Sequence, residues 1–277
     1  MSRRDTTGVT GGNILAVCGP IGVGKTTLIK SLGNVLNRPV HFISLAGASG
    51  GSFLLGHSFT YEGSVYGEIM AALISAQSMS AVVVFDELDK VSQGDNGRGE
   101  EIYNALVHLT DPNQQSVFTD RYFGFKIDLS QTLFCFSYND ESRVPPVLRD
   151  RIHQVSVTDF SFDDKQKIAK QFLLPSMSKE LGLSERDFVI EDDAIALLVK
   201  ETTQAQTGLR QVKQALIQIV RGVNLAKLSR RKDGVTFLSD DVVDNVVLPV
   251  RVTCTHVERL LQQSKLENND AAFFMYN

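Results

Sequence analysis

A run of glycines that ends in a lysine and a threonine stands near the start of the chain. Residues 19–26 (Gly-Pro-Ile-Gly-Val-Gly-Lys-Thr) match every fixed position of the pattern G-x-x-x-x-G-K-[ST]. Glycines let backbone N–H groups crowd around phosphate oxygens, and the positive end of a following helix strengthens that attraction. Lys25 would reach the β- and γ-phosphates of a nucleotide, and the Thr26 hydroxyl would ligate Mg²⁺. The run therefore predicts a nucleotide site made of Gly19, Pro20, Ile21, Gly22, Val23, Gly24, Lys25, Thr26 and Thr27.

The residues on either side of this run support that interpretation. Ile14–Cys18 is a short apolar stretch typical of a buried strand, and Leu28, Ile29 and Leu32 recur at helical spacing. A strand, a glycine loop and a helix in this order are the context that the motif needs. With this context intact, the pattern favours a phosphate site over its alternative, an ordinary glycine turn.

Two adjacent carboxylates end a second apolar stretch, Ala81–Phe85. Strands this uniformly apolar are usually covered on both faces, as in a parallel sheet, and ligands of such sheets bind beyond the carboxyl ends of the strands. Asp86 would orient Mg²⁺ and its waters, and Glu87 would polarise the water that attacks the γ-phosphate. The alternative is a solvated pair of charges at a strand end. The glycine loop elsewhere in the sheet favours the catalytic interpretation.

Several other polar residues are candidates for the same site. Asn139 follows the apolar stretch Gln131–Ser137 and could position the attacking water, although asparagine is also common in turns. In Arg149-Asp-Arg151, a guanidinium could meet the charge that develops during phosphoryl transfer, often from a neighbouring subunit. Arg210, at the start of a long helix, could reach the phosphates. The alternative for each arginine is an ordinary surface position.

An aromatic residue, Tyr61, lies in the glycine-flanked stretch Phe59–Gly63. An aromatic side chain on an exposed loop is a candidate for gripping a peptide, because aromatic residues dominate the energetics of many interfaces. The alternative is that Tyr61 packs on its own domain.

Apolar stretches alternate with helical patterns over the first 160 residues. This order requires crossover connections and predicts an α/β fold with a doubly wound parallel sheet. The expected strands are 14–18, 40–45, 81–86, 131–137 and 154–157, and a hairpin is expected at 116–127.

The pattern changes after residue 160, where long helical stripes predict a small α-helical lid domain. The helices are expected at 163–173, 192–202 and 208–228, with a strand-like piece at 235–238, a helix at 240–247 and an amphipathic helix near 256–265. The predicted organisation is a flexible lead-in at 1–12, a nucleotide-binding domain at 13–160, the lid domain at 161–250 and a C-terminal tail at 251–277.

The net charge of the chain disfavours nucleic acid and anionic membranes as partners. The 277 residues carry a formal net charge of −4, which gives no broad field for nucleic acid or for an anionic membrane. The basic run 230–232 is short and is explained by its place at a helix C-terminus. No apolar run approaches the length of a membrane span. The three cysteines lie far apart in the sequence, as in a reduced, cytoplasmic protein.

The order of these features resembles the AAA+ ATPases, and the details resemble the ATPase module of the Lon proteases. The most Lon-like stretch is Leu-Thr-Asp-Pro-Asn-Gln-Gln-Ser-Val-Phe-Thr-Asp-Arg-Tyr at 109–122. The other matching stretches are Gly-Pro-Ile-Gly-Val-Gly-Lys-Thr (19–26), Gly-His-Ser-Phe-Thr-Tyr-Glu-Gly (56–63), Phe-Asp-Glu-Leu-Asp-Lys (85–90), Pro-Pro-Val-Leu-Arg-Asp-Arg (145–151) and Thr-Gly-Leu-Arg (207–210).

The resemblance implies an ATPase that uses ATP and Mg²⁺, assembles into a homo-hexameric ring and pulls unfolded polypeptide through it. It implies that Lys25 and Thr26 form the Walker A pair and that Asp86 and Glu87 form the Walker B pair. It further implies roles for Asn139 as sensor 1, Arg151 as the arginine finger, Arg210 as sensor 2 and Tyr61 as the aromatic of the first pore loop.

The chain also departs from the Lon pattern. The Ser–Lys proteolytic domain that follows the lid in that family is not expected after residue 250, and the family's segment before the first strand has no counterpart. We therefore expect a Lon-like ATPase, as a fragment of a Lon protease or as a free-standing protein, with a protease subunit in trans as a candidate partner. The alternative is an accessory subunit or fragment that binds ATP without hydrolysing it and assembles with a complete Lon-like protease. A nucleic-acid motor is disfavoured by the charge, and a small-molecule kinase would leave the lid, Asn139 and Arg151 without a role.

Overall fold

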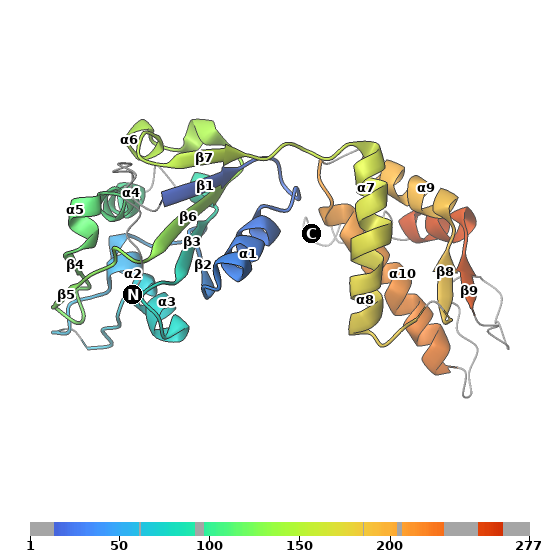
Figure 1. The fold of residues 1–277 in the computed structure, drawn as a ribbon, viewed down its shortest axis with the longest axis horizontal. Helices are drawn as coiled ribbons and strands as arrows, with labels where there is room; N and C mark the ends of the chain where they lie inside the picture. The colour runs from blue at the N-terminus through green and yellow to red at the C-terminus, as the bar shows by residue number, and fades with distance from the viewer. Residues whose placement is uncertain are drawn as a thin grey trace, which may run out of the picture. The chain divides into compact units, whose positions relative to one another are not determined.

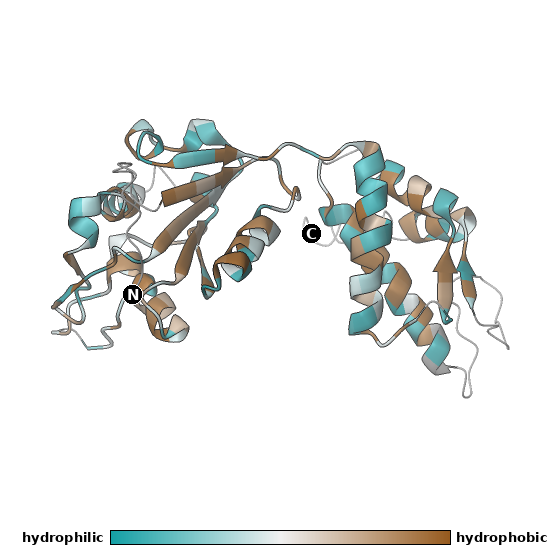
Figure 2. Cartoon of the chain, in the orientation of Figure 1, coloured by the Kyte–Doolittle hydropathy of each residue, from teal (hydrophilic) through white to brown (hydrophobic). Residues whose placement is uncertain are grey.

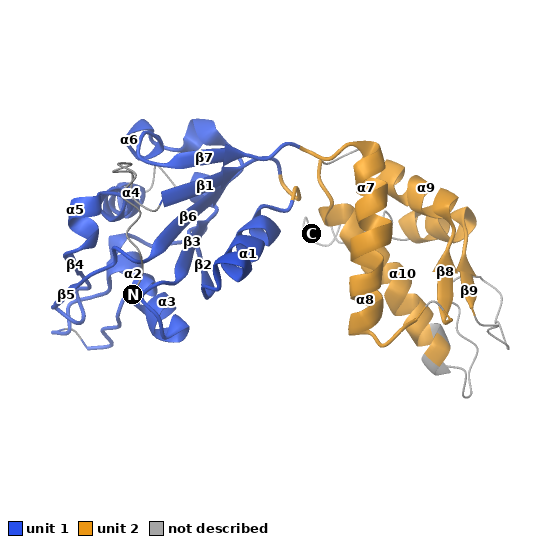
Figure 3. Cartoon of the chain, in the orientation of Figure 1, with its two compact units in different colours: residues 1–20, 24–158 blue, residues 21–23, 159–277 orange. Residues whose placement is uncertain are grey.

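The computed structural model describes residues 14–60, 62–91, 97–184, 186–203, 207–229 and 249–262. The chain divides into two compact units, of which the first holds residues 1–20 and 24–158 and the second holds residues 21–23 and 159–277 (Figure 3). Among the helices of the described residues, none has both the length and the apolar character that a membrane span requires.

A five-stranded parallel sheet forms the centre of the first unit (Figure 1). Its strands lie in the order β2 (Val40–Ser44), β3 (Val82–Asp86), β6 (Leu133–Tyr138), β1 (Ile14–Cys18) and β7 (His153–Ser156). Because neighbours in this sheet are not consecutive in the chain, crossover connections join them. The predicted α/β fold with a doubly wound parallel sheet is therefore confirmed. The last strand begins one residue earlier than expected.

Alternate residues of β3 face opposite sides of the sheet, and each side has its own cover. Val82 and Val84 pack in one cluster with Ile29 of α1 (Lys25–Leu36). Val83 and Phe85 pack in a larger cluster on the other side. That cluster is completed by α2 (Gly51–Leu55), α3 (Glu68–Ala76) and α4 (Arg98–Leu109). Figure 2 shows the resulting concentration of apolar residues along the strands.

Several short elements connect these layers. The strands β4 (Phe118–Thr119) and β5 (Lys126–Ile127) pair antiparallel, which confirms the predicted hairpin. The remaining short helices are η1 (Leu88–Lys90), α5 (Pro112–Gln115), η2 (Glu141–Arg143) and α6 (Pro146–Arg149).

The second unit is mainly helical and has a separate apolar core. A long stripe of buried residues on α10 (Arg210–Ser229) packs against buried residues of α9 (Asp192–Thr203). Three consecutive helical segments, α7 (Phe162–Ile168), η3 (Ala169–Leu173) and α8 (Leu174–Glu180), lie against them. A two-stranded parallel sheet of β8 (Phe188–Ile190) and β9 (Val250–Val252) completes the unit.

One predicted boundary was wrong. We expected a tail from residue 251, but Val252 pairs with Ile190 and is fully buried. Residues 254–262 are helical and bury Val257 and Leu260 in the same core. A three-residue strand carries too few positions to show a period, and so the sequence pattern did not reveal it. The strand and helix expected at 235–238 and 240–247 lie outside the described residues.

Candidate active site

The carboxyl ends of β3, β6 and β1 meet at one edge of the sheet. Phe85 pairs with Phe136, and Cys18 pairs with Tyr138. This register puts Asp86 level with Ser137 and starts the glycine loop beside the end of β6. The residues predicted to act on a nucleotide therefore emerge side by side, at the edge where open α/β sheets bind their ligands.

The glycine loop joins β1 to α1 in a conformation that other residues would resist. Gly19, Gly22 and Gly24 all have positive φ angles, of 153°, 82° and 89°. A Cβ atom on Gly19 would lie 2.2 Å from the carbonyl oxygen of Val157. Gly24 is the N-cap of α1, and no side chain caps this helix end. The first N–H groups of α1 are thus left for an anion.

Lys25 folds back onto this loop. Its Nζ donates to the carbonyl oxygens of Gly19 at 2.7 Å and Pro20 at 2.8 Å, and to Asn139 Oδ1 at 2.6 Å. Burial lowers the pKa of Lys25, and the carboxylates of Asp86 and Asp89 partly offset this effect. The structure thus brings together Lys25 and Asn139, two residues that the sequence predicted for one site.

The acidic pair lies at the end of the neighbouring strand. Asp86 Oδ1 accepts hydrogen bonds from Ser137 Oγ and, at 3.0 Å, from the Glu87 N–H. Glu87 itself has φ 60° and ψ 43°, a left-handed conformation that is costly for a residue with a side chain. Such backbone outliers gather at functional sites. Within the described part of the chain, no residue hydrogen-bonds to the Glu87 carboxylate, which is therefore available to a bound water.

A residue that the sequence analysis missed, Asp89, fixes the turn that presents Asn139. Asp89 is 4% exposed, and its Oδ2 accepts from the N–H groups of Asn139 and Asp140, both at 3.2 Å. Its Oδ1 is buried without a hydrogen-bond partner among the described residues. The available signal was an acidic residue three positions after Asp86, where a solvated charge would be the ordinary interpretation. The structure shows that this carboxylate joins the ends of β3 and β6.

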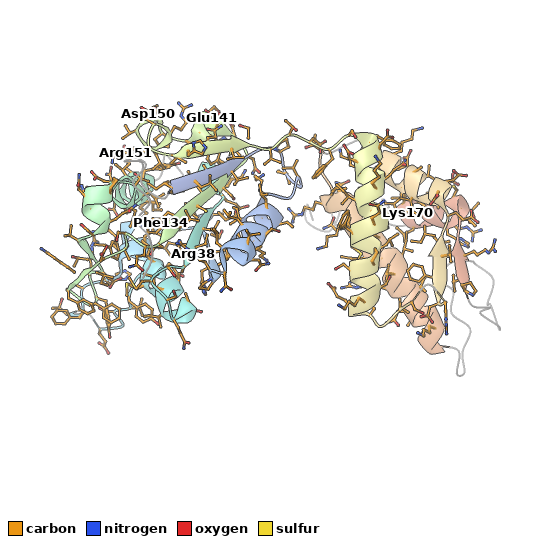
Figure 4. All side chains as sticks on the ribbon, in the orientation of Figure 1. Arg38, Phe134, Glu141, Asp150, Arg151 and Lys170 are labelled. Carbon is orange, nitrogen blue, oxygen red and sulfur yellow. The ribbon has the colours of Figure 1, made fainter. Side chains whose placement is uncertain are left out.

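Arg151 lies beside α4 in the first unit (Figure 4). Its Nη1 donates to the carbonyl oxygen of Val107 at 3.3 Å and lies 3.8 Å from Asp111 Oδ2. The neighbouring Arg149 instead contacts Glu141 Oε1 at 3.4 Å. The guanidinium of Arg151 is partly exposed, and so it is accessible from outside the unit.

Arg210 is exposed at the start of α10, and the residues before it pack on the tip of the glycine loop. Within the second unit, Leu209 N–H donates to the carbonyl oxygen of Gly22 at 2.9 Å. Gly208 has φ 86°, and a Cβ atom there would lie 2.3 Å from the carbonyl oxygen of Ile21. Only glycine allows this approach without displacing the loop.

A partly buried ion pair supports Gly208. The Gly208 N–H donates to Asp159 Oδ1 at 3.0 Å, while Lys165 Nζ donates to Asp159 Oδ2 at 2.7 Å. Burial by itself raises the pKa of Asp159, but the hydrogen bonds from Lys165, Phe160 N–H and Gly208 N–H outweigh it, and the pKa lies below its ordinary value. Asp159 therefore holds the segment before Arg210 through one carboxylate oxygen, and Lys165 holds Asp159 through the other.

The other predicted residues differ in how far the structure describes them. Thr26 and Thr27 lie exposed in the first turn of α1. Tyr61 lies outside the described residues. The loop that contains it is closed at its base, because His57 N–H donates to the carbonyl oxygen of Val65 at 3.1 Å.

The described residues fit Mg²⁺ only together with a phosphate ligand. Among them, no group of three or more His, Cys, Asp or Glu side chains could hold a metal ion alone. Mg²⁺ typically takes one or two protein oxygens and fills its other positions with waters and substrate phosphates. The exposed Thr26 hydroxyl and the Asp86 carboxylate match that donor set.

Comparison with known proteins gives both a family and specific relatives. Residues 15–159 match the family described as "ATPase family associated with various cellular activities (AAA)". A "Lon protease homolog" of Acanthamoeba polyphaga mimivirus is 36% identical over 222 residues, which are 79% of this chain and 21% of that protein. The "Lon protease" of Campylobacter concisus is 36% identical over 226 residues, 82% of this chain and 28% of that protein. The "Lon protease homolog 2, peroxisomal" of Pichia angusta is 36% identical over 209 residues, 76% of this chain and 22% of that protein. The chain thus spans about a quarter of the length of these relatives, and the resemblance noted in the sequence is confirmed.

Proposed function

Since this chain belongs to the AAA family of ATPases, we propose that it binds ATP with Mg²⁺, hydrolyses the nucleotide and uses the energy to unfold or translocate polypeptide. The observation that carries the proposal is the hydrogen bond between Lys25 and Asn139, at an edge where Asp86 and Glu87 also end a strand. One residue from each of three neighbouring strand ends would then act on the same γ-phosphate.

Each residue has a distinct part in this reaction. The N–H groups of the loop and the Lys25 ammonium bind the phosphates, and Thr26 and Asp86 would hold Mg²⁺, which would supply positive charge that offsets the phosphate oxygens. Glu87 accepts a proton from the attacking water, and Asn139 orients that water. The water oxygen bonds to the γ-phosphorus as the bond to the β–γ bridging oxygen breaks. ADP leaves with the electron pair, and the proton passes from Glu87 to the released phosphate.

Arg151 would act on the nucleotide of a second copy of the chain. Its partial exposure and its contacts with Val107 and Asp111, rather than with Lys25, support a role across an interface. This role requires contact between two copies of the chain, and we propose a homo-hexameric ring, with Arg210 as a further residue that would act on the nucleotide. Such a trans-acting arginine contributes a large part of the rate in many nucleotide hydrolases.

The polypeptide substrate is proposed from the relatives, which are named as proteases. Tyr61 would grip an unfolded chain, and a protease in trans would cleave it in a reduced intracellular compartment. The Ser178–Lys179 pair is not proposed as a protease site, because Ser178 Oγ donates to the carbonyl oxygen of Leu174 in its own helix at 2.8 Å. ATP hydrolysis is the reaction proposed for this chain.

Steady-state ATP hydrolysis tests the proposal. Wild type and Glu87→Gln are compared over a range of protein concentration, with and without casein. Specific activity that rises with concentration and with casein, and that disappears in Glu87→Gln, is the expected result. Turnover that survives the substitution would overturn the role of Glu87. Nucleotide-dependent assembly without any turnover would instead identify an accessory, ATP-binding subunit.

A further inference from the structure

One buried lysine in the second unit has no part in the proposed reaction. Lys165 is the only basic side chain that is buried among the residues that the structure describes. Its ammonium donates to Asp159 Oδ2 at 2.7 Å, and no other acceptor within the described residues contacts it. A buried ammonium is costly unless an anion pairs with it. The position of Asp159 in the folded protein is therefore coupled to that of Lys165.

The start of α7 fixes the position of Lys165. Ser161 caps this helix, because its Oγ accepts from the Asp164 N–H at 3.2 Å and donates to Asp164 Oδ2 at 2.6 Å. The carbonyl oxygen of Ser161 also accepts from the Lys165 N–H at 2.9 Å. The segment between Asp159 and Lys165 is therefore a fixed turn, and the ion pair closes it.

Asp159 also binds the segment that precedes α10. Its other oxygen, Oδ1, accepts from the Phe160 N–H at 2.9 Å and from the Gly208 N–H at 3.0 Å. These bonds, together with the bond from Lys165, occupy both oxygens of the carboxylate. Hydrogen bonds to an ionised acceptor are roughly twice as strong as those between neutral groups. Asp159 therefore fixes the backbone at Gly208.

The next residue after Gly208 sets the direction of an N–H group in the glycine loop. Leu209 N–H donates to the carbonyl oxygen of Gly22 at 2.9 Å, and residues 21–23 belong to the same compact unit as Leu209 (Figure 3). In a trans peptide unit the C=O and N–H groups point in opposite directions. The Val23 N–H shares its peptide unit with the Gly22 carbonyl and therefore points away from Leu209. Within the described residues this N–H has no hydrogen-bond partner, and so it is available to a phosphate oxygen.

We propose that Asp159 is a positioning residue for the nucleotide phosphates, because it holds the segment that orients the Gly22–Val23 peptide. The inference rests on the proposed function, in which the glycine loop binds ATP. A donor that already points at its ligand saves the free energy of ordering it during binding. Without the Asp159 carboxylate, each nucleotide would have to order this peptide again. The KM for ATP should therefore rise, while kcat stays close to the wild-type value because Asp159 contacts neither Glu87 nor Asn139.

Isothermal titration of the full chain with ADP and Mg²⁺ tests the binding step. Asp159→Ala should weaken ADP binding about tenfold, the effect of losing roughly one hydrogen bond. Asp187→Ala is the matched control in the same unit, because Asp187 accepts from the Ser184 N–H at 2.8 Å and from Lys227 Nζ at 2.9 Å but has no hydrogen bond to the glycine loop. The control should lose stability in thermal unfolding and keep the wild-type affinity.

A second substitution at the ion pair provides a rescue. Asp159→Asn keeps the oxygen that accepts from the Gly208 N–H but leaves the Lys165 ammonium buried without an anion, and should also weaken ADP binding. Adding Lys165→Met removes that charge and should return the affinity to within about threefold of wild type. A role of Asp159 in stability alone would change the unfolding temperature of these variants without changing their affinity.

Amide hydrogen exchange supplies a readout that needs no nucleotide. In the nucleotide-free chain, Asp159→Ala should accelerate exchange at Gly208 and Leu209 about tenfold, and Asp187→Ala should not. Unchanged exchange at these amides would overturn the inference, as would equal ADP affinities in Asp159→Ala and wild type or an equal loss in Asp187→Ala. A wild type that binds ADP but does not hydrolyse ATP would contradict the proposed hydrolysis and leave the inference standing, whereas one that binds no ADP would contradict both.

Discussion

Lys25 Nζ donates to Asn139 Oδ1 over 2.6 Å, although 114 residues separate the two. The bond connects the loop after β1 to the turn after β6. Lys25 uses its remaining hydrogens on the carbonyl oxygens of Gly19 and Pro20. A γ-phosphate would compete for the same ammonium, and so nucleotide binding and the position of Asn139 are linked.

Asn139→Ala should separate binding from turnover. Removing the amide takes away the group that the proposed mechanism uses to orient the water, while the loop and the Lys25 side chain remain. We expect kcat to fall at least about tenfold, with ATP affinity changed far less. Phosphate release and the binding of a fluorescent ATP analogue measure the two quantities. Asn113→Ala, at an exposed position, should change neither. An equal loss of affinity and kcat would contradict this role.

Substitutions of Glu87 should separate backbone strain from chemistry. Glu87 has a left-handed conformation, and glycine adopts that conformation freely. Glu87→Gly should abolish hydrolysis yet raise the free energy of unfolding by up to about 1 kcal/mol. Gln77→Gly relieves a similar conformation at φ 51° and should raise stability without loss of activity. Thermal unfolding and ATPase rates measure stability and activity in both variants. If only Gln77→Gly raises the free energy of unfolding, the backbone of Glu87 is not strained.

Removal of the Asp89 carboxylate should loosen the turn that presents Asn139. Asp89→Ala leaves the partly buried N–H groups of Asn139 and Asp140 without their acceptor and should lower the free energy of unfolding by about 1–3 kcal/mol. Asp89→Asn keeps one acceptor oxygen and should lose less stability while still lowering kcat more than it raises KM. Asp128→Ala removes an exposed carboxylate that accepts from Ser130 N–H and serves as the control. If Asp128→Ala and Asp89→Ala are equally mild, the proposed positioning role is wrong.

The contact between Gly208 and the glycine loop should be sensitive to a single methyl group. Gly208→Ala puts a Cβ atom 2.3 Å from the carbonyl oxygen of Ile21 and should weaken ATP binding about tenfold by displacing the loop. Gly182 has a positive φ of 65° but open space around its Cβ direction, and so Gly182→Ala carries the conformational cost alone. Isothermal titration with ATP compares the two variants. Equal affinities would show that the loop tolerates the displacement.

Local sequence patterns correctly predicted the elements that carry a strict motif or a long apolar run or stripe. The strand–loop–helix around Lys25 was predicted because glycine, lysine and threonine spacing is dictated by phosphate geometry. The five strands and the helical stripe of α10 were predicted from apolar runs and periodicity, which directly reflect burial. That Lys25 and Asn139 belong to one site followed from the rule that ligands bind beyond the carboxyl ends of the strands, whereas the direct hydrogen bond between them was not predicted.

Long-range packing was what the sequence could not show. The pairing of β9 with β8 joins segments far apart in the chain, and a strand of three residues has no measurable period. The burial of Asp89 depends on the turn after β6, which donates two N–H groups to it. The contacts of Arg151 with Val107 and Asp111 could not be predicted either, because neither residue is unusual in its own segment. Tyr61 remains a prediction.

Because no side chain caps the start of α1, the free energy of unfolding should depend on the nucleotide concentration. Gly24 offers no side chain to the first N–H groups of the helix, and a phosphate would satisfy them instead. By thermodynamic linkage, a ligand present at a hundred times its dissociation constant adds about 2.7 kcal/mol to the free energy of unfolding. A fall in nucleotide concentration would therefore raise the unfolded fraction of a protein that binds nucleotide at this helix.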